Sequence, residues 1–229
     1  MRIDRVVRYY TNNSSSANPP HREPAVRFYS EVIFPRLCDL FLSRPYVAQH
    51  RHRLLASADG DVLEIGFGTG LNLAHYPDQV RKITTVDPNA GMHRLAQRRV
   101  RRSRIAVEQR VLSGERLPFE DNRFDCAVST FTLCSIDHVS QAVSEVRRVL
   151  RPGGRFLFLE HGLSPEPGIQ NWQHRLNWLE RRLGDGCRLD RNMKALVAEQ
   201  PFSSVAVDEF YLEHTPKTHG YLYRGAATK

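Results

Sequence analysis

The sequence of 229 residues carries a formal net charge of +8, with 33 basic and 25 acidic side chains. Its length suits one α/β domain rather than two, and its four cysteines lack the C-x-x-C spacing of a metal site or disulfide framework. Because no apolar run approaches the roughly 20 residues of a membrane span, and the first residues lack a signal-peptide core, we expect a soluble cytoplasmic protein without a bound metal. The basic charge leaves an anionic substrate, a membrane surface or nucleic acid open as partners.

The first part of the chain divides into a polar arm and a helical region. Residues 1–22 include the run TNNSSSANPP, which offers few groups to bury, so we expect a flexible arm there. Residues 23–229 are then predicted to form a single domain. Apolar side chains at helical spacing predict N-terminal helices over residues 28–57. These helices either cap a ligand cleft or pack against the edge of a sheet.

The stretch Asp61–Asn72, which reads DVLEIGFGTGLN, predicts a strand, a glycine loop and the start of a helix. Its short apolar run is typical of a buried parallel strand. Gly66, Gly68 and Gly70 allow the backbone to turn sharply and to pass close to a ligand. A dinucleotide site would need a glycine where Leu71 stands, so the spacing disfavours NAD as the ligand.

Glu64 lies inside this apolar strand, where a carboxylate is costly to bury without a partner and would suit a cationic ligand. The order E-x-G-x-G-x-G after an apolar strand resembles the first motif of the class I S-adenosylmethionine-dependent methyltransferases. The resemblance implies S-adenosylmethionine as the cofactor, bound by Glu64 and the three glycines. It also implies an α/β, Rossmann-like fold: a mostly parallel seven-stranded sheet with a C-terminal antiparallel hairpin and helices on both faces.

After a helix over residues 71–76, the sequence predicts a second strand over 82–86 that stops at Asp87. Asp87 follows Gly70 by 17 positions. This spacing is close to the value of about 20 at which nucleotide-binding folds present a carboxylate to ribose hydroxyls. Asp87 is therefore a candidate cofactor ligand, and capping of the next helix is its alternative role.

A run of five arginines covers the end of the next predicted helix, residues 91–101, and the turn before a third strand over 105–112. We interpret the run as a solvated helix end; binding to an anionic membrane or to nucleic acid is the alternative. Its members are Arg98, Arg99, Arg101, Arg102 and Arg104.

The segment SGERLPFEDNRFD resembles the part of the methyltransferase family that holds adenine through an acid and a backbone N–H. Ser113 replaces the usual acid and is followed by Gly114 and Glu115, so adenine binding would rest on backbone groups and a hydroxyl. A fourth strand over 124–130 ends at Thr130, at the edge where open α/β sheets bind ligands. The following loop lacks the N-P-P-Y or D-P-P-Y motif, which disfavours nucleic-acid methylation.

A helix over 138–150 and a fifth strand over 155–159 deliver His161 to the predicted cleft. His161 titrates near neutral pH, so it is the candidate for favouring an acceptor thiolate or taking a proton. A packed or solvated histidine is the alternative. We predict that Cys134 and Cys187 are small buried residues, because methyl transfer requires no enzyme thiol.

The last third of the chain predicts a helix with an apolar stripe over 169–183, a helix over 192–200, and two strands forming an antiparallel hairpin. The segments LCS, EHG and DGC, together with FPRLCDL and HGYLYRGAA, resemble the thiol S-methyltransferases and their bacterial relatives. The resemblance implies a small-molecule acceptor and favours a thiol sulfur. Two alternatives remain: methylation of an amine or of a phospholipid head group such as phosphatidylethanolamine, and a basic binding module without activity. Peripheral membrane contact and the oligomeric state stay open.

Overall fold

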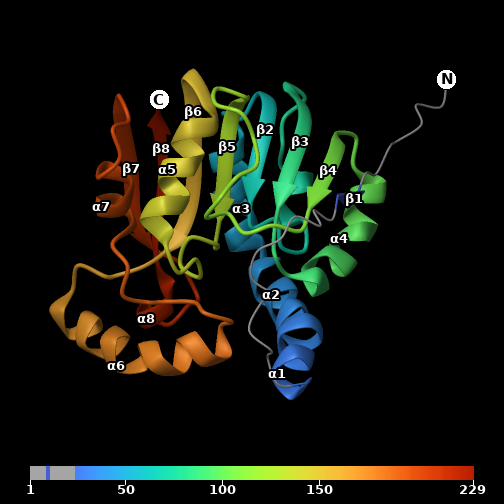
Figure 1. Ribbon diagram of the computed structural model, residues 1–229. Coiled ribbons are helices and arrows are strands. Elements are labelled where there is room, and N and C mark those ends of the chain that lie inside the picture. The colour runs from blue at the N-terminus through green and yellow to red at the C-terminus, as the bar shows by residue number, and fades with distance from the viewer. Residues whose placement is uncertain (1–8, 11–23) are drawn as a thin grey trace.

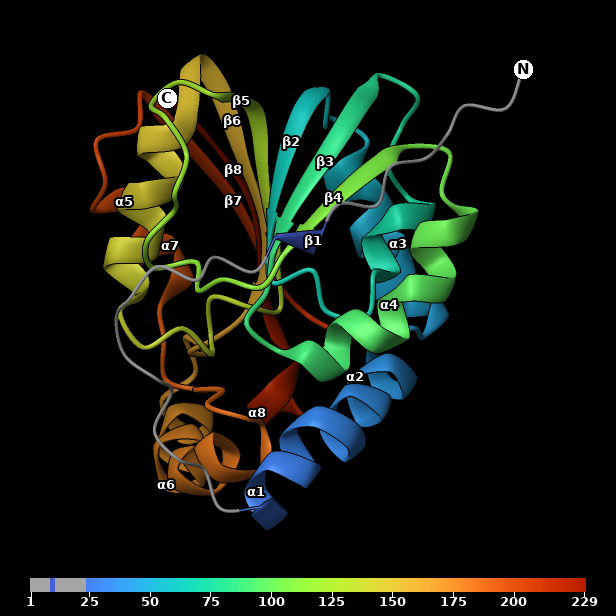
Figure 2. The ribbon, with the colours of Figure 1, turned by 45° about the vertical axis from the view of Figure 1, so that its right-hand side comes forward.

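The computed structural model describes residues 9–10 and 24–229, which form a β-sheet with helices on both faces (Figures 1 and 2). The arm predicted over residues 1–22 lies outside the described part of the chain, apart from the two residues of the first strand. The strands are β1 Tyr9–Tyr10, β2 Gly60–Ile65, β3 Val80–Val86, β4 Ala106–Arg110, β5 Phe124–Thr130, β6 Leu150–His161, β7 Ser204–Tyr211 and β8 Tyr221–Thr228.

The strands lie in the order β1-β4-β3-β2-β5-β6-β8-β7 across the sheet. Pairing is parallel from β1 to β6, whereas β8 runs antiparallel to both β6 and β7. The predicted seven-stranded, mostly parallel sheet with a C-terminal antiparallel hairpin is therefore confirmed, and β1 adds two residues at one edge. Chain order reverses at β2, which has β3 on one side and β5 on the other. Open α/β sheets bind ligands at such a reversal, beyond the carboxyl ends of the strands.

The helical segments range from single turns to the 17 residues of the longest helix. They are α1 Pro24–Phe28, η1 Tyr29–Ile33, α2 Phe34–Leu42, α3 Pro45–Leu55, η2 Leu71–Ala74, α4 Ala90–Arg102, α5 Val139–Val149, α6 Pro167–Leu183, α7 Met193–Ala198 and α8 Lys217–Gly220. Figure 2 shows α3 and α4 on one face of the sheet and α5 and α7 on the other. α1, α2 and α6 lie beyond the carboxyl ends of the strands, at the bottom of Figure 1.

Alternation along the strands produces an apolar layer on each face of the sheet. In β2, Leu63 belongs to the layer that includes Val143 of α5. Val62 belongs to the opposite layer, with Leu55 of α3. Glu64 stands two residues after Val62, and its side chain therefore points to the α3 face.

The crossover after β2 is shorter than predicted. In place of a helix over residues 71–76, the chain forms one 3-10 turn, η2. The Asn72 side chain turns inward and donates to the Glu64 carboxylate at 2.8 Å, so this segment is fixed by a buried polar contact rather than by an apolar helix face. Pro77 follows shortly afterwards and lacks the N–H that a longer helix would use.

No helix in the described residues 9–10 and 24–229 combines the length and the apolarity needed to cross a membrane.

Large apolar side chains are exposed on the elements beyond the carboxyl ends of the strands. Both tryptophans of the chain lie on α6. The exposed side chains on α1, η1, α2 and α6 are Val26, Phe28, Ile33, Leu37, Leu40, Phe41, Trp172, Trp178, Leu179 and Leu183.

Candidate functional site

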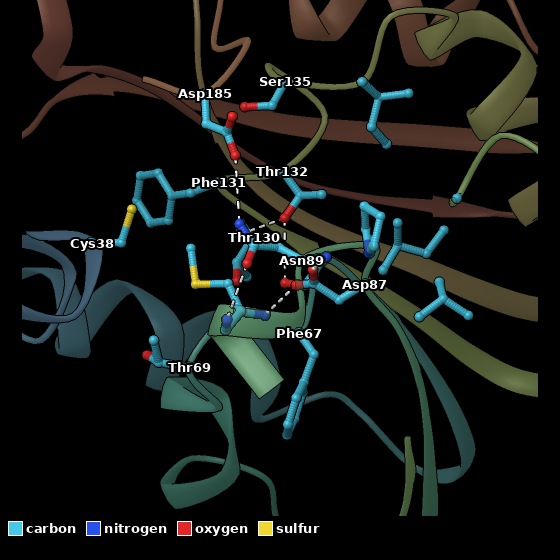
Figure 3. Close-up of a pocket in the computed structure, with 18 of the residues that line it drawn as sticks. Cys38, Phe67, Thr69, Asp87, Asn89, Thr130, Phe131, Thr132, Ser135 and Asp185 are labelled. Atoms are coloured by element: carbon cyan, nitrogen blue, oxygen red, sulfur yellow. Dashed lines mark hydrogen bonds between the residues drawn. The ribbon is translucent and has the colours of Figure 1, made fainter. Parts of the chain in front are cut away.

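A pocket of about 380 Å³ lies at the carboxyl ends of β2, β3 and β5, where the chain order reverses. Its volume is within the range of small-molecule and cofactor sites. Figure 3 shows Ser135 and Asp185 on one side of the pocket, Thr69 on the other, and Cys38 extending from α2. α2 forms one wall with the side chains of Phe34, Cys38 and Leu42.

Two hydrogen bonds fasten η1 to the last residue of α6 and to the segment that follows it. The Tyr29 hydroxyl donates to the carbonyl of Leu183 at 2.6 Å, and the Ser30 hydroxyl donates to the Asp185 carboxylate at 2.7 Å. Since Asp185 lines the pocket, these bonds join two chain segments that are far apart in sequence at one side of it.

The glycine loop after β2 holds its backbone in the left-handed region, with φ of 70° at Gly66, 56° at Gly68 and 79° at Gly70. A Cβ on Gly66 would also collide with the side chain of Thr132, so both conformation and space require glycine there. Gly66 and Gly68 line the pocket. Gly70 is not among the lining residues and lies against the ring of Phe67.

Asp87 lies at the end of β3, is only 5% exposed and lines the pocket. Its two carboxylate oxygens accept from the backbone N–H groups of Gly68 and Asn89, each at 2.8 Å. Burial raises the pKa of Asp87, while these two N–H groups act in the opposite direction. The N-cap of α4 is Asn89, whose side chain accepts from two backbone N–H groups of the first turn. Asp87 therefore does not cap the helix, and each of its oxygens keeps a lone pair for a ligand.

Glu64 does not line the pocket and belongs to a buried polar network behind it. Its carboxylate accepts from the Asn72 side chain and from the Tyr76 hydroxyl, each at 2.8 Å. Burial raises the pKa of Glu64 to about 7, although those two hydrogen bonds and the charge of Arg51 lower it. The partner predicted for this acid is thus supplied by the protein itself.

Arg51 of α3 is the cation of this network, and sequence reasoning missed it. Its Nη1 donates to Asn72 at 2.7 Å and to the Thr130 hydroxyl at 2.8 Å. Burial lowers its pKa to about 10. Arg51 and Thr130 both line the pocket, so the network fixes the orientation of the Thr130 hydroxyl. The available signal was the place of Arg51 one helical turn after Val47, on the apolar face of α3.

Ser113, Gly114 and Glu115 also line the pocket, and one local and one longer-range hydrogen bond hold this turn. The Ser113 hydroxyl accepts from the Glu115 backbone N–H at 3.2 Å, and the Glu115 carboxylate accepts from the backbone N–H of His138 at 2.8 Å. A Cβ on Gly114 would lie 2.7 Å from Cγ2 of Ile65. This turn therefore presents its backbone close to the end of β2.

His161 is not among the residues that line the pocket, contrary to the position predicted at the mouth of the cleft. It is half-buried, and its Nε2 lies 2.8 Å from Sγ of Cys187, which lies 3.3 Å from Sγ of Cys134. Burial lowers the pKa of His161, but the neighbouring Cys134 thiolate outweighs that effect and raises it to about 9. A hydrogen bond from Cys187 holds the pKa of Cys134 well below its usual range. The two cysteines are buried, as predicted, but they form a polar cluster with the histidine.

The predicted arginine run is not uniform in the structure. Arg99 is half-buried and fastens α4 to α2 and to the glycine loop, whereas the other four are exposed: Arg98, Arg101, Arg102 and Arg104. Arg99 donates to the Asp39 carboxylate at 2.7 Å and to the carbonyl of Thr69 at 3.0 Å. Arg99 is thus a structural support for the pocket wall.

Arg99→Gln should therefore raise the dissociation constant of the cofactor about fivefold, because a partly exposed ion pair is worth about 1 kcal/mol. Arg98→Gln, one residue away on the exposed side of α4, should leave the constant unchanged. Isothermal titration calorimetry with S-adenosylhomocysteine measures both variants. Equal values for the two variants would show that the contact to Asp39 does not support the site.

Comparison with known proteins gives a consistent result. Residues 63–158 match the methyltransferase domain family. The chain is 35% identical over 152 residues to thiol S-methyltransferase TMT1B of Rattus norvegicus, covering 64% of this chain and 62% of that protein. It is 35% identical over 149 residues to thiol S-methyltransferase TMT1A of Homo sapiens, covering 63% and 60%. The chain thus spans less than two thirds of the length of these relatives.

Among solved structures, a possible histamine N-methyltransferase from Thermotoga maritima has a TM-score of 0.63 and 20% identity, covering 89% of this chain and 98% of that chain. Residues 63–158 thus resemble the methyltransferase domain family, and the chain as a whole shares the fold of these enzymes. A geranyl diphosphate methyltransferase in complex with S-adenosylmethionine has a TM-score of 0.60 and 17% identity, covering 79% and 83% of the two chains. At these identities the likeness shows that this chain has the same fold as these two proteins.

S-adenosylmethionine is the cofactor of this methyltransferase family, and the pocket fits it. Gly66 and Gly68 present bare backbone to the pocket, and a Cβ on Gly68 would meet no atom nearer than the Gly66 carbonyl oxygen at 3.9 Å, so a ligand can approach the loop closely. A buried carboxylate at Asp87 offers acceptors for hydroxyl groups. These features lie on adjacent strand ends and face one cavity (Figure 3).

Proposed function

We propose that this methyltransferase transfers the methyl group of S-adenosylmethionine to the sulfur of a small exogenous thiol. The observation that supports the acceptor class is the 35% identity to two proteins named as thiol S-methyltransferases. Proteins that share only the fold are named for other acceptors, namely histamine and geranyl diphosphate. The acceptor is therefore inferred from sequence similarity and from the lining of the pocket.

In this proposal the cofactor is held from three sides. The backbone of Gly66 and Gly68 approaches it closely, and Asp87 accepts hydrogen bonds from its ribose hydroxyls. The turn from Ser113 to Glu115 meets the adenine end with backbone groups. Glu64 does not contact the cofactor in this proposal. Its hydrogen bond with Asn72 supports the η2 turn beside the pocket. The bound cofactor supplies a methyl group already activated by its sulfonium sulfur.

The other end of the pocket offers an apolar surface to the acceptor. Phe34 and Leu42 of α2 and Phe131 after β5 line it, which favours a thiol with a small apolar body. The contribution of the chain is to hold this thiol in position and to exclude water, and positioning alone can supply about 7 to 11 kcal/mol of the barrier. A thiol with a pKa of about 8.5 ionises readily in solution. Direct proton transfer to His161 is not required, and His161 does not line the pocket.

An acceptor screen with methyl-labelled cofactor tests the proposal. Small alkyl and aryl thiols should be methylated, and the rate should rise with pH as the free thiol ionises. Amines and vesicles of phosphatidylethanolamine should give turnover at least about tenfold lower at neutral pH, because an ammonium must lose a proton before it can attack. Turnover of amines or phosphatidylethanolamine without turnover of any thiol would contradict the proposed acceptor class.

A further inference from the structure

Three segments that are distant in sequence meet at one cluster of side chains. Cys134 lies in the loop after β5, His161 ends β6, and Cys187 follows α6. Nε2 of His161 lies 2.8 Å from Sγ of Cys187, and the two sulfur atoms are 3.3 Å apart. The three motifs LCS, EHG and DGC, which lie apart along the chain, thus each contribute one side chain to the same place.

We propose that Cys134, His161 and Cys187 form a binding site for one soft or borderline divalent cation of the zinc type. Their candidate ligand atoms all lie within 4.8 Å of one another. Two thiolates and an imidazole are the donor types that select Zn²⁺ over Mg²⁺ or Ca²⁺. The sequence predicted no bound metal because its cysteines lack the short C-x-x-C spacing. Cys134, His161 and Cys187 are 27 and 26 residues apart along the chain and come together only in the folded protein.

The separation of the donors suits a single ion. In a tetrahedral site with Zn–S bonds of about 2.3 Å, two sulfur ligands lie about 3.8 Å apart. The observed 3.3 Å between Cys134 and Cys187 therefore requires a shift of well under 1 Å. Three protein ligands leave a fourth position for a water molecule or an exogenous thiol, as in metal sites with an open coordination position.

The backbone around the ligands is already fixed. The N–H of Arg188 donates to the carbonyl of Cys134 at 3.1 Å, which joins the segment of Cys187 directly to the loop after β5. The N–H of Gly162 donates to Tyr221 of β8 at 3.0 Å and holds the end of β6. The sites of the three ligands are thus positioned by contacts that do not depend on an ion. Nδ1 of His161 is buried and has no hydrogen-bond partner among the described residues.

The cluster also adjoins the proposed acceptor pocket. Ser135, which follows Cys134 directly, and Asp185, two residues before Cys187, both line that pocket. An ion in the cluster would therefore join the two segments that form this side of the pocket. The inference of a metal site itself rests on the ligand geometry and not on the proposed acceptor.

Titration of the full chain with Co²⁺ and Zn²⁺ tests the site. The protein is first stripped of metal with a chelator and kept reduced with a phosphine. We expect one Co²⁺ per chain, a thiolate-to-cobalt absorption band, displacement of that band by Zn²⁺, and a higher midpoint of thermal unfolding with Zn²⁺ than without. Cys134→Ser and Cys187→Ser should each weaken binding about 100-fold or more, since loss of a direct ligand should cost at least as much as loss of a supporting contact.

Cys126→Ala is the matched control, because Cys126 is a buried cysteine on β5 outside the cluster; it should bind Co²⁺ like the unmodified chain. Circular dichroism checks that each variant is folded, and the unfolding midpoint of the unmodified chain tests the site without any variant. Absence of the band in the unmodified chain, or its survival in both serine variants, would overturn the proposal. The proposal would also be overturned if reduced Cys134 and Cys187 bound no cation and instead formed a disulfide in air, with the loss of two free thiols per chain.

Discussion

Replacement of Asp87 with alanine should weaken cofactor binding by about 1.5 to 3 kcal/mol, or roughly 10-fold to 150-fold, the usual worth of hydrogen bonds to a charged group. The physical reason is that Asp87 is a buried carboxylate that lines the pocket and has acceptor capacity beyond its bonds to the backbone of Gly68 and Asn89. Calorimetric titration with S-adenosylhomocysteine measures the effect.

Asp208→Ala provides the control for this variant. Asp208 pairs with Arg224 at the β7 edge of the sheet and is 69% exposed, so its loss should leave the dissociation constant unchanged. Nicotinamide nucleotides should not compete in either protein. A folded Asp87→Ala variant with the affinity of the unmodified chain would remove Asp87 from the site, and competition by NADH would contradict the assignment of the cofactor.

Substitution of Gly66 by alanine should abolish measurable cofactor binding and lower thermal stability. The added Cβ would collide with the Thr132 side chain, and the residue would remain at a φ of 70° that alanine rarely adopts. Overpacking of this kind costs typically about 1 to 3 kcal/mol in stability. Differential scanning calorimetry and cofactor titration report the two effects separately.

A double variant separates the two causes. Thr132→Gly removes the colliding side chain, so Gly66→Ala combined with Thr132→Gly should recover part of the stability lost in Gly66→Ala alone. Gly168→Ala is the matched control, since a Cβ there meets nothing within 4 Å and should lower neither quantity. Equal stability of the single and double variants would show that collision with Thr132 is not the cause.

The parts of the site that sequence could predict are those fixed by neighbours along the chain. The glycine loop and Asp87 each follow directly after a strand, so their place at the carboxyl edge follows from the strand pattern alone. The need of Glu64 for a partner was also apparent, because a carboxylate stood in an apolar run. The cation of its network was not apparent, because Arg51 reaches the network from α3.

The remaining features depend on packing between distant segments. Asn72 turns inward and reduces a predicted helix to one turn, which a pattern of apolar residues does not encode. Cys134, His161 and Cys187 become neighbours only because β5 and β6 pair side by side and the chain returns after α6. His161 was expected at the mouth of the pocket because β6 ends there, but the direction of its ring is set by the two cysteines.

The position of the two tryptophans determines what intrinsic fluorescence can report. Trp172 and Trp178 are 54% and 67% exposed, and both lie on α6 outside the two apolar layers of the sheet. Emission from the native protein should already be that of hydrated indole, and denaturation of the sheet should change it little. Urea curves followed by tryptophan emission and by far-ultraviolet circular dichroism need not coincide, because the first probe follows the surroundings of one peripheral helix. For this chain such a mismatch is not a sign of a partly folded core, and cooperativity is better judged by calorimetry.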